Sequence, residues 1–440
     1  MAEKLPTLRT AAYPGDFSVD SETEMSEKIE RTIIEQIIEG LTKQVEPKSG
    51  ESKEGGLVVA SDRKKCLSTG SYEEIIEYFY NNHFTDGLAI NPPTIEKVEK
   101  FLNYTDYSPN EEICLLSPGN RRATPLNVAA NGVMAGCRPE HMPILTAAVE
   151  AMATPPFELP HLGTTGGLNP YLWLNGPIIK QLGFSYQTAL TNRGPNPAIG
   201  RAIGLFIRNI ADLVPGEQAM GTFGYIMPFA LAEDEDNSPW EPFHVEHGYD
   251  KNANTVTVGG TYNWGFQGFP SGTEPEGYLK TICREVVKHG HFMVTTFAGH
   301  YQMMVILINP SVAKALARAG YTKQNVKSFV FENSKDTIEN LISILKYGDG
   351  VGRGHTIRSC IEDGWGTPKE WADLEPNVMV PVMIYPEVIH ILVCGTRDRN
   401  KVMAFYGNYN RPSIKEIKLP KNWDELMERL GYPPLQNFYK

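Results

Sequence analysis

The N-terminal part of the chain contains one strongly amphipathic segment. Ser21 and Glu24 have the Ser-x-x-Glu spacing of a capping box, which marks the start of a helix. Apolar residues then recur every three or four positions, as on one face of a helix: Met25, Ile29, Ile33, Ile34, Ile37, Ile38 and Leu41. We predict a helix over residues 25–41 that buries this face against the body of the chain or in a homo- or hetero-oligomer.

The residues after this helix have no apolar periodicity. Residues 45–56 are rich in Lys, Glu, Ser and Gly, which is typical of a flexible linker. We therefore divide the chain into an N-terminal arm, residues 1–56, and an α/β body, residues 57–440. The body allows a further division into two subdomains, residues 57–215 and 216–440.

Short apolar runs alternate with helical patterns throughout the body. Ser71 and Glu74 form a second capping box, and Asn309 followed by Pro310 predicts a helix that ends at Gly320. The predicted strands cover residues 57–60, 171–174, 255–258, 303–308, 378–384, 389–393 and 402–406. This alternation predicts an α/β fold with mixed sheets and flanking helices, in addition to the N-terminal helical arm. We find no long repeat period in the sequence.

The acidic composition of the chain argues against nucleic acids and anionic membranes as binding partners. The 440 residues include 41 basic and 52 acidic side chains, a net charge of −11, without a block rich in Lys or Arg. Such a chain is a poor candidate for binding nucleic acid or an anionic membrane. No segment approaches the ~18 to 20 continuous apolar residues of a membrane span. Six cysteines without a C-x-x-C pair favour a cytoplasmic protein with reduced thiols.

Cys137 lies in a predicted corner between two helices. The first helix starts at Thr124 and ends at Gly136, and Pro139 starts the next. The free N–H groups and positive dipole of a helix start, together with Arg138, would favour the thiolate, whereas the C-terminal end of the preceding helix opposes this. Cys137 is therefore either a reactive thiol or a small side chain that fills a tight corner.

A second helix start carries candidate binding residues. Residues 191–197 read Thr-Asn-Arg-Gly-Pro-Asn-Pro, with Asn196 as the predicted N-cap of an apolar helix. The loop would place Asn192 and Arg193 beside the positive end of that helix, where a carboxylate or phosphate group binds favourably. In the alternative interpretation, Arg193 forms a surface salt bridge and the loop only makes a turn.

Histidines and carboxylates in the middle of the chain offer a different chemistry. His244 and His247 are three residues apart, a spacing that matches no zinc pattern. A metal-assisted hydrolase or lyase that uses these two histidines and an acidic partner is an alternative function. The acidic run at residues 233–236 is expected to be a solvated face, although Glu233 or Glu235 could serve as a general base. The sequence assigns no metal site and no cofactor.

Four motifs resemble a poorly characterised family of bacterial proteins over residues 71–411. They are Thr-Asp-Gly-Leu-x-x-Asn-Pro-Pro-Thr at 85–94, Asn-Gly-Val-Met-Ala-Gly-Cys-Arg-Pro-Glu at 131–140, Ser-Pro-Trp-Glu-Pro-x-His at 238–244 and Ala-Gly-Tyr-Thr-Lys-x-x-Val-Lys-x-Phe at 319–329. Members of that family resemble, or accompany, proteins with a Sec-Gly-Ser-Cys or Cys-Gly-Ser-Cys (UGSC) redox motif of the glycine-reductase type. This chain lacks that redox motif.

The resemblance implies an α/β enzyme subunit that works with a separate thiol or selenol redox protein. It implies roles for Cys137 and Glu140 in one motif and for Trp240 and His244 in another, with Asn131 as a further substrate-binding candidate. Relatives tend to read Asn-Arg-Ala-Asn-Ala where this chain reads Asn-Arg-Gly-Pro-Asn-Pro at 192–197, which puts a shared substrate in doubt.

From these observations we predict a cytoplasmic enzyme, or a subunit of an enzyme complex, that acts on a small anionic metabolite by thiol-linked reductase or lyase chemistry. The predicted catalytic residues are Cys137, Glu140 and His244. The predicted substrate-binding residues are Asn131, Asn192, Arg193, Asn196 and Trp240. A non-catalytic scaffold or ligand-binding subunit of a redox complex, docked through the helix at residues 25–41, is a third alternative.

Overall fold

The chain forms two units in the computed structural model, Met1–Arg63 and Lys64–Lys440. The structure describes residues 11–15, 20–43, 66–222, 224, 227–271, 274–295, 303–347, 354–407 and 411–439, with only the backbone over 289–295. The predicted linker at 45–56 and the predicted strand at 57–60 lie outside the described residues.

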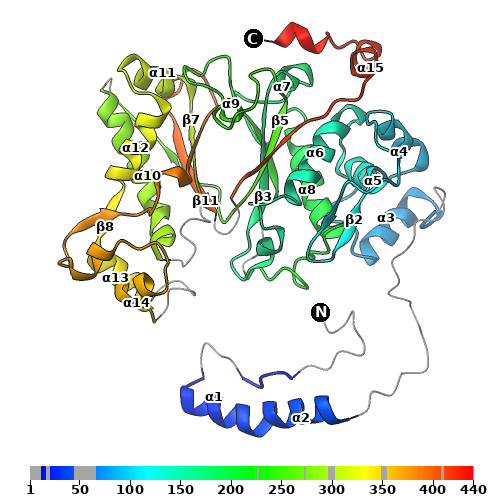
Figure 1. Ribbon diagram of the computed structural model, residues 1–440. Helices are drawn as coiled ribbons and strands as arrows, with labels where there is room; N and C mark the ends of the chain where they lie inside the picture. Colours follow the sequence, from blue (N-terminus) through cyan, green and yellow to red (C-terminus); the bar gives the residue numbers. More distant parts are fainter. Residues whose placement is uncertain are drawn as a thin grey trace. The chain divides into compact units, whose positions relative to one another are not determined.

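The first unit contains the predicted N-terminal helix. It consists of α1 (Glu22–Lys28), a π-helical turn (Ile29–Ile33) and α2 (Ile34–Thr42), drawn in blue in Figure 1. The Ser21 hydroxyl accepts the Glu24 N–H while the Glu24 carboxylate accepts the Ser21 N–H, which confirms the capping box. Several apolar side chains of the predicted stripe are exposed, and Leu41 is 83% exposed.

The second unit has an α/β fold with mixed sheets flanked by helices, as predicted. Its helices are α3 (Tyr72–Asn81), α4 (Ile95–Leu102), α5 (Pro125–Ala135), α6 (Met142–Met152), α7 (Ile178–Gln181), α8 (Asn196–Asn209), α9 (Phe243–Glu246), α10 (Pro275–Thr295), α11 (Pro310–Arg318), α12 (Lys323–Asn333), α13 (Ile338–Tyr347), α14 (Ile357–Glu362) and α15 (Trp423–Arg429). Its strands are β1 (Cys114–Leu116), β2 (Arg121–Ala123), β3 (Asn169–Asn175), β4 (Phe229–Ala232), β5 (Thr255–Thr261), β6 (Gln267–Gly268), β7 (Met303–Ile308), β8 (Lys335–Thr337), β9 (Met379–Pro381), β10 (Ile389–Val393), β11 (Val402–Gly407) and β12 (Ser413–Glu416).

Two four-stranded sheets share one connectivity. In the first sheet, with the order β12-β5-β3-β4, β4 is parallel to β3, and β5 and β12 are antiparallel to their neighbours. In the second sheet, with the order β6-β11-β7-β10, β10 is parallel to β7, and β11 and β6 are antiparallel to theirs. Each half of the chain therefore runs from a central strand through helices to a parallel neighbour, and then to an antiparallel strand on the other side.

The fourth strand of each half pairs with the sheet of the other half. β6 follows β5 in the chain but pairs with β11, whereas β12 follows β11 but pairs with β5. The two crossing segments meet where the Tyr262 N–H and the Thr261 hydroxyl both donate to the Tyr406 carbonyl. Both sheets are thus completed by a strand exchanged between the halves.

The sheets pack face to face between two layers of helices. Figure 1 shows α10 to α12, the sheet with β7 and β11, the sheet with β3 and β5, and α6 with α8 as successive layers of this unit. Successive residues of β3 alternate between cores, because Tyr171 and Trp173 face the second sheet while Leu172 and Leu174 face the helices. Both faces of the central strands are therefore buried in each sheet.

Local sequence signals explain how the flanking helices begin and pack. Asn309 is the N-cap residue of α11, Pro310 opens the helix, and Gly320 follows it with a φ of 89°, as predicted. A Cβ atom on Gly200 of α8 would lie 2.5 Å from the Pro228 carbonyl oxygen. This glycine allows α8 to approach the segment that leads into β4.

Candidate functional site

The parallel strands of the two sheets end at equivalent positions. The Glu233 N–H donates to the Leu174 carbonyl over 3.2 Å, and the Cys394 N–H donates to the Ile308 carbonyl over 3.1 Å. Glu233 and Cys394 are therefore the first residues after β4 and β10, and the neighbouring strands lead to an asparagine as well: Asn175 ends β3, and Asn309 directly follows β7. The two strand ends also join directly, because the Asp234 N–H donates to the Val393 carbonyl. Ligands of open α/β sheets bind beyond the carboxyl ends of parallel strands, which makes this region the first place to look for a site.

Glu233 is a buried carboxylate that holds several of these elements together. One of its oxygens accepts hydrogen bonds from the Asn175 side chain at 2.6 Å and from the Phe243 N–H at 2.9 Å. The other accepts the Val393 N–H at 3.5 Å and lies 4.0 Å from the Lys323 ammonium. Burial raises the pKa of Glu233, and Lys323 opposes that rise. These contacts give the carboxylate a structural role between the two sheets.

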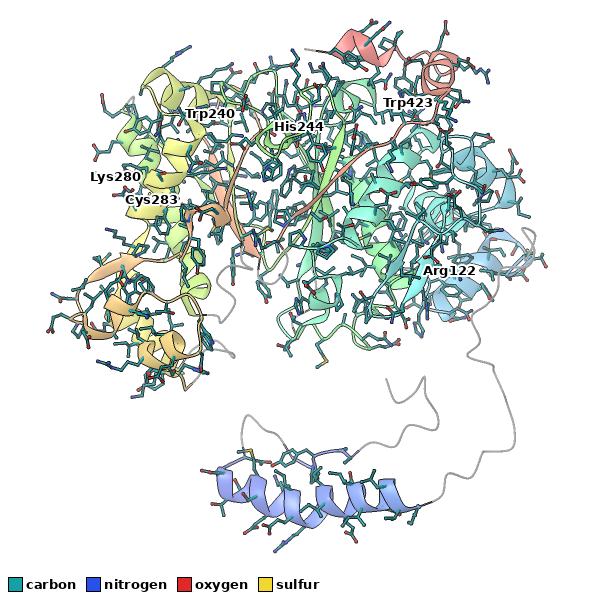
Figure 2. All side chains as sticks on the ribbon, in the orientation of Figure 1. Arg122, Trp240, His244, Lys280, Cys283 and Trp423 are labelled. Atoms are coloured by element: carbon teal, nitrogen blue, oxygen red, sulfur yellow. The ribbon has the colours of Figure 1, made fainter. Side chains whose placement is uncertain are left out.

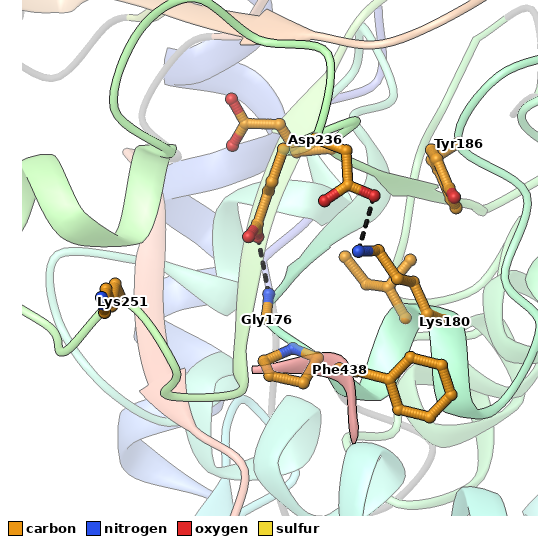
Figure 3. A pocket seen from close by; sticks show the side chains of 10 residues that line it. Gly176, Lys180, Tyr186, Asp236, Lys251 and Phe438 are labelled. Carbon is orange, nitrogen blue, oxygen red and sulfur yellow. Dashed lines mark hydrogen bonds and ion pairs between the residues drawn. The ribbon is translucent and has the colours of Figure 1, made fainter. Parts of the chain in front are cut away.

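The cavity beyond β3 and β4 is almost filled by its own side chains. Figure 3 shows Lys180 paired with Asp236 at 2.5 Å, and the Gly176 N–H donates to the Glu235 carboxylate at 2.7 Å. The remaining volume is about 10 Å³, which is enough for about one water molecule. Among the described residues, the cavity at the ends of β3 and β4 has no room for a metabolite.

The equivalent position in the second half is open. A cavity of about 350 Å³, which we call the Cys394 pocket, lies beyond the ends of β7 and β10. That volume falls within the usual range for small-molecule sites, about 300 to 1,000 Å³. Its lining residues are Gln187, Ala189, Leu190, Thr191, Asn192, Trp264, Gln267, Leu307, Asn309, Cys394, Gly395, Thr396, Arg399, Lys401, Val402 and Met403.

The charge of the Cys394 pocket is positive. Arg399 and Lys401 are the charged side chains among the lining residues in the described part of the chain. The Lys401 ammonium lies 3.1 Å from the centre of the Phe269 ring, a cation–π contact that anchors its side chain. Asn309 shapes the wall, because its side chain donates to the Thr396 carbonyl and accepts the Lys401 N–H. The pocket is therefore suited to an anion.

The Cys394 thiol is protonated in this setting. Its side chain is 3% exposed and lies in the core between the two sheets. Burial raises the pKa of Cys394, and the nearby carboxylates of Glu233 and Asp234 raise it further. A neutral thiol can donate a hydrogen bond or a proton, whereas nucleophilic attack requires the thiolate.

The predicted binding loop contributes to this pocket only in part. Asn192 lines the pocket, and Arg193 is exposed without being one of the lining residues. Asn196 is buried at the first position of α8, after Pro195 as the N-cap, which corrects its predicted place by one residue. Its amide donates to the carbonyls of Ser185, Leu190 and Ala230 and accepts the Ser185 N–H. Asn196 therefore holds the loop in place, and its side chain is not available to a substrate.

The predicted site around Cys137 is also corrected by the structure. Cys137 is 7% exposed in the core beneath the first sheet, and burial raises the pKa of its thiol instead of lowering it. The following segment begins with a 3-10 turn (Pro139–His141), and Arg138 pairs with the buried Glu140 at 2.8 Å. The Arg138 charge that was expected to favour a thiolate is thus paired with Glu140, and the cysteine fills the corner.

Asn131 is likewise occupied within the helical layer. Its amide group donates to the Asn127 carbonyl at 2.8 Å, and its oxygen accepts the Asn209 side chain at 2.7 Å. The asparagine thereby connects α5 with α8. Its role in substrate binding stays a prediction, and the structure shows a structural role for its side chain.

Trp240 and His244, which are labelled apart from each other in Figure 2, both belong to the segment that connects β4 with β5, and neither lines the Cys394 pocket. The Trp240 indole donates to the Tyr321 carbonyl at 3.0 Å. His244 is fully buried, with its Nδ1 atom 3.9 Å from the Glu235 carboxylate. Trp240 thus connects the acidic segment to Tyr321, and His244 places α9 beside Glu235. The acidic run is not the solvated face that was predicted, because Glu233 and Asp234 are 2% and 0% exposed.

The metal alternative finds little support in the geometry. His247 is exposed, and its ring packs on Phe243 with its Nδ1 atom 2.8 Å from the Phe243 carbonyl. Among the residues that the structure describes, no three His, Cys, Asp or Glu side chains lie close enough to hold a metal ion. His244 and His247 thus do not form a ligand set with an acidic partner in this part of the chain.

Sequence reasoning missed Cys394, although a signal was available. The apolar run at residues 389–393 was correctly predicted as a strand, and Cys394 follows it directly. A chemically active side chain at the carboxyl end of a predicted parallel strand is a candidate site residue. The direction of β10 in its sheet, however, is set by pairing with β7, far away in the sequence.

Comparisons with known proteins add no family. The sequence matches no protein-family model and no curated protein, and the fold matches no solved structure. In the described ranges, no helix combines the length and the apolar character needed to cross a bilayer.

Proposed function

We propose that the protein is an enzyme, or the substrate-binding subunit of an enzyme complex, that holds a small anionic metabolite in the Cys394 pocket. The observation that carries this proposal is a cavity of about 350 Å³ with two cations and a cysteine in its lining, at the carboxyl end of two parallel strands. Asn192 is the predicted binding residue that belongs to it.

The state of the thiol favours one class of chemistry. Because burial and two carboxylates favour the neutral thiol of Cys394, it can donate a hydrogen bond to a bound anion. A redox reaction that starts from a thiolate would first have to remove the proton from Cys394, which burial and the two carboxylates oppose. We therefore favour a lyase over a reductase, with Cys394 as a hydrogen-bond donor to the bound anion and not as the reactive thiolate first considered at Cys137.

We also propose that the protein acts in the cytoplasm together with a partner protein. The motif resemblance supports a separate thiol or selenol redox protein as partner, and the exposed apolar face of the π turn and α2 supports assembly into an oligomer. All six cysteines lie in the described part of the chain and are free thiols, which supports a cytoplasmic protein.

Competing alkylation reagents test the pocket without knowledge of the substrate. Iodoacetate and iodoacetamide react with the same thiolate but differ in charge, so the ratio of their rates reports the local potential. We expect iodoacetate to be favoured at Cys394 by at least about fivefold relative to Cys66, because ~1 kcal/mol of attraction to Arg399 and Lys401 acts on the anion. Mass spectrometry of each cysteine-containing peptide gives the ratio.

Two double variants control this measurement. Arg399→Gln/Lys401→Gln should abolish the preference at Cys394, whereas Lys100→Gln/Lys280→Gln changes the net charge equally at exposed positions and should preserve it. Cys137, which is buried and does not line the pocket, should show no preference for iodoacetate. If Cys394 shows the same ratio as the exposed Cys66, the pocket does not attract anions and the proposal fails.

A further inference from the structure

The wall of the Cys394 pocket includes an aromatic ring whose orientation is fixed by the core. Trp264 is 40% exposed and lines the pocket. Its indole stacks on Phe405 with 5.8 Å between ring centres and 28° between planes, and it meets Phe229 edge to face at 4.8 Å. Because Phe405 and Phe229 are themselves buried, they hold the indole as a rigid platform.

The remaining walls separate an apolar side from a charged side. Leu190, Leu307 and Met403 line the pocket together with the indole and provide hydrocarbon contacts. Arg399 and Lys401 provide the positive charge. A small, strongly hydrated anion would contact the two cations and leave the apolar side of the pocket exposed to water. A ligand with both an apolar body and a negative group would contact both sides, and the pocket therefore fits such a ligand better.

We propose that the ligand of the Cys394 pocket is a planar ring that bears an anionic group, with the ring against Trp264 and the anion toward Arg399 and Lys401. This inference rests on the proposed function and narrows its substrate class. Offset stacking on an indole contributes about 0.5 to 1.5 kcal/mol beyond burial of area, an advantage that a saturated ring does not have. The negative group can be a carboxylate or a phosphate, since both pair with Arg and Lys.

Four probes of similar size separate the ring from the charge. 2-Naphthoate and 2-naphthyl phosphate carry the planar ring with either anion, decahydro-2-naphthoate keeps the carboxylate without the planar ring, and 2-naphthamide keeps the ring without the charge. We expect one or both naphthyl anions to bind the full-length protein, with a Kd at least about threefold lower than that of either control. Isothermal titration calorimetry measures the affinities, and the two naphthyl anions distinguish a carboxylate site from a phosphate site.

Two variants of the platform complete the test. Trp264→Leu should raise the Kd of the naphthyl anion by about threefold to tenfold, and Trp264→Phe should retain most of the affinity because it keeps a ring. Thermal melts of both variants show whether the fold is preserved. A Trp264→Leu protein that is folded and binds normally overturns the inference.

The outcomes also separate this inference from the proposed function. Equal binding of 2-naphthoate and decahydro-2-naphthoate, with weaker binding of 2-naphthamide, would refute the planar ring and leave the anion site intact. Failure of all four probes to bind would also refute the inference. The proposed function would then be judged by the alkylation ratios at Cys394, which need no ligand.

Discussion

Glu233 and Cys394 occupy equivalent positions at the ends of two parallel strands, but their neighbours differ. Glu233 is enclosed by hydrogen-bond donors from β3, α9 and β10, and the cavity beside it holds about one water. The Cys394 side chain has a single thiol in place of a carboxylate, and it borders the larger of the two cavities. At the scale of single residues, Glu233 therefore connects structural elements, whereas Cys394 borders a cavity large enough for a small ligand.

The pH dependence of stability follows from another buried residue, His141. Its Nδ1 atom accepts the Arg138 N–H at 3.1 Å, and burial lowers the pKa of His141 to about 3, with a smaller contribution from Arg138. An unfolded histidine has a pKa of about 6.5, so between these values the unfolded chain binds the additional proton. The free energy of unfolding should therefore fall as the pH falls from about 6.5 toward 3.

His141→Gln tests this expectation. Between pH 6.5 and pH 5 the wild-type protein should lose about 1 to 2 kcal/mol more than the variant, measured by urea denaturation at each pH. The pKa of His390 is also lowered by burial, which adds a loss of the same sign to both proteins and cancels in the comparison. Parallel pH profiles for the two proteins would show that His141 does not carry the effect.

At the scale of elements, the N-terminal helix is the least buried part of the described chain. None of the residues of α1, the π turn and α2 is buried, and Ile34 and Ile38 on successive turns are 45% and 55% exposed. The helix is anchored locally by few contacts, such as the hydrogen bond from Lys28 to Asp20. An isolated helix of this length is marginally stable in water, so its apolar face is expected to bind another surface.

We expect this face to assemble copies of the chain or to bind a partner chain. Ile34→Ser/Ile38→Ser should reduce the mass in sedimentation experiments to that of the 49.0 kDa monomer. Arg31→Ser/Glu35→Ser, on exposed polar positions of the same helix, keeps the net charge and should leave assembly unchanged. A wild-type protein that sediments as a monomer, alone and in extracts of its source, would remove this role from the helix.

Elements with strong local signals were predicted well from the sequence. The strands at 303–308 and 389–393 match exactly, and both capping boxes at Ser21 and Ser71 are present. The short strands β4, β6 and β12 were not predicted, because two to four residues carry too little periodicity and their pairing is decided by distant partners.

The candidate site was harder to predict than the elements. Asn131, Asn196 and Glu140 are polar residues near helix ends, which is typical of binding sites and of buried structural hydrogen bonds alike. Only the tertiary fold shows that their partners are other parts of the chain. The Cys394 pocket brings together residues 187–192, 264–267, 307–309 and 394–403, and no local pattern indicates that these segments meet.

At the scale of the whole second unit, exchanged strands and a shared core connect the two halves. β6 and β12 each complete the sheet of the other half, and the core between the sheets contains residues from both, including Tyr171, Leu231, Val305 and Phe405. Neither sheet can lose its structure without exposing the apolar face of the other. We therefore expect the two halves to unfold in one cooperative transition.

Leu231→Ala in β4 is expected to destabilise both halves together. The leucine is 1% exposed, so the substitution should lower the free energy of unfolding by about 2 to 5 kcal/mol and shift one common transition. Differential scanning calorimetry, with near-ultraviolet circular dichroism as a second probe, measures this. Leu67→Ala, at a position 60% exposed, should change the stability by less than about 0.5 kcal/mol. Two separate transitions in the second unit would contradict the expectation.

The exchange of β6 and β12 also constrains the order of events during translation. β5 and β6 leave the ribosome before β11 and β12 have been made, so neither exchanged strand can find its partner until nearly the whole chain has been synthesised. At about 5 to 20 residues per second, the nascent N-terminal half waits for several seconds with an unpaired sheet edge. Chaperones that bind such edges should therefore associate with this chain late in its synthesis, and truncation before β12 should leave a product that aggregates.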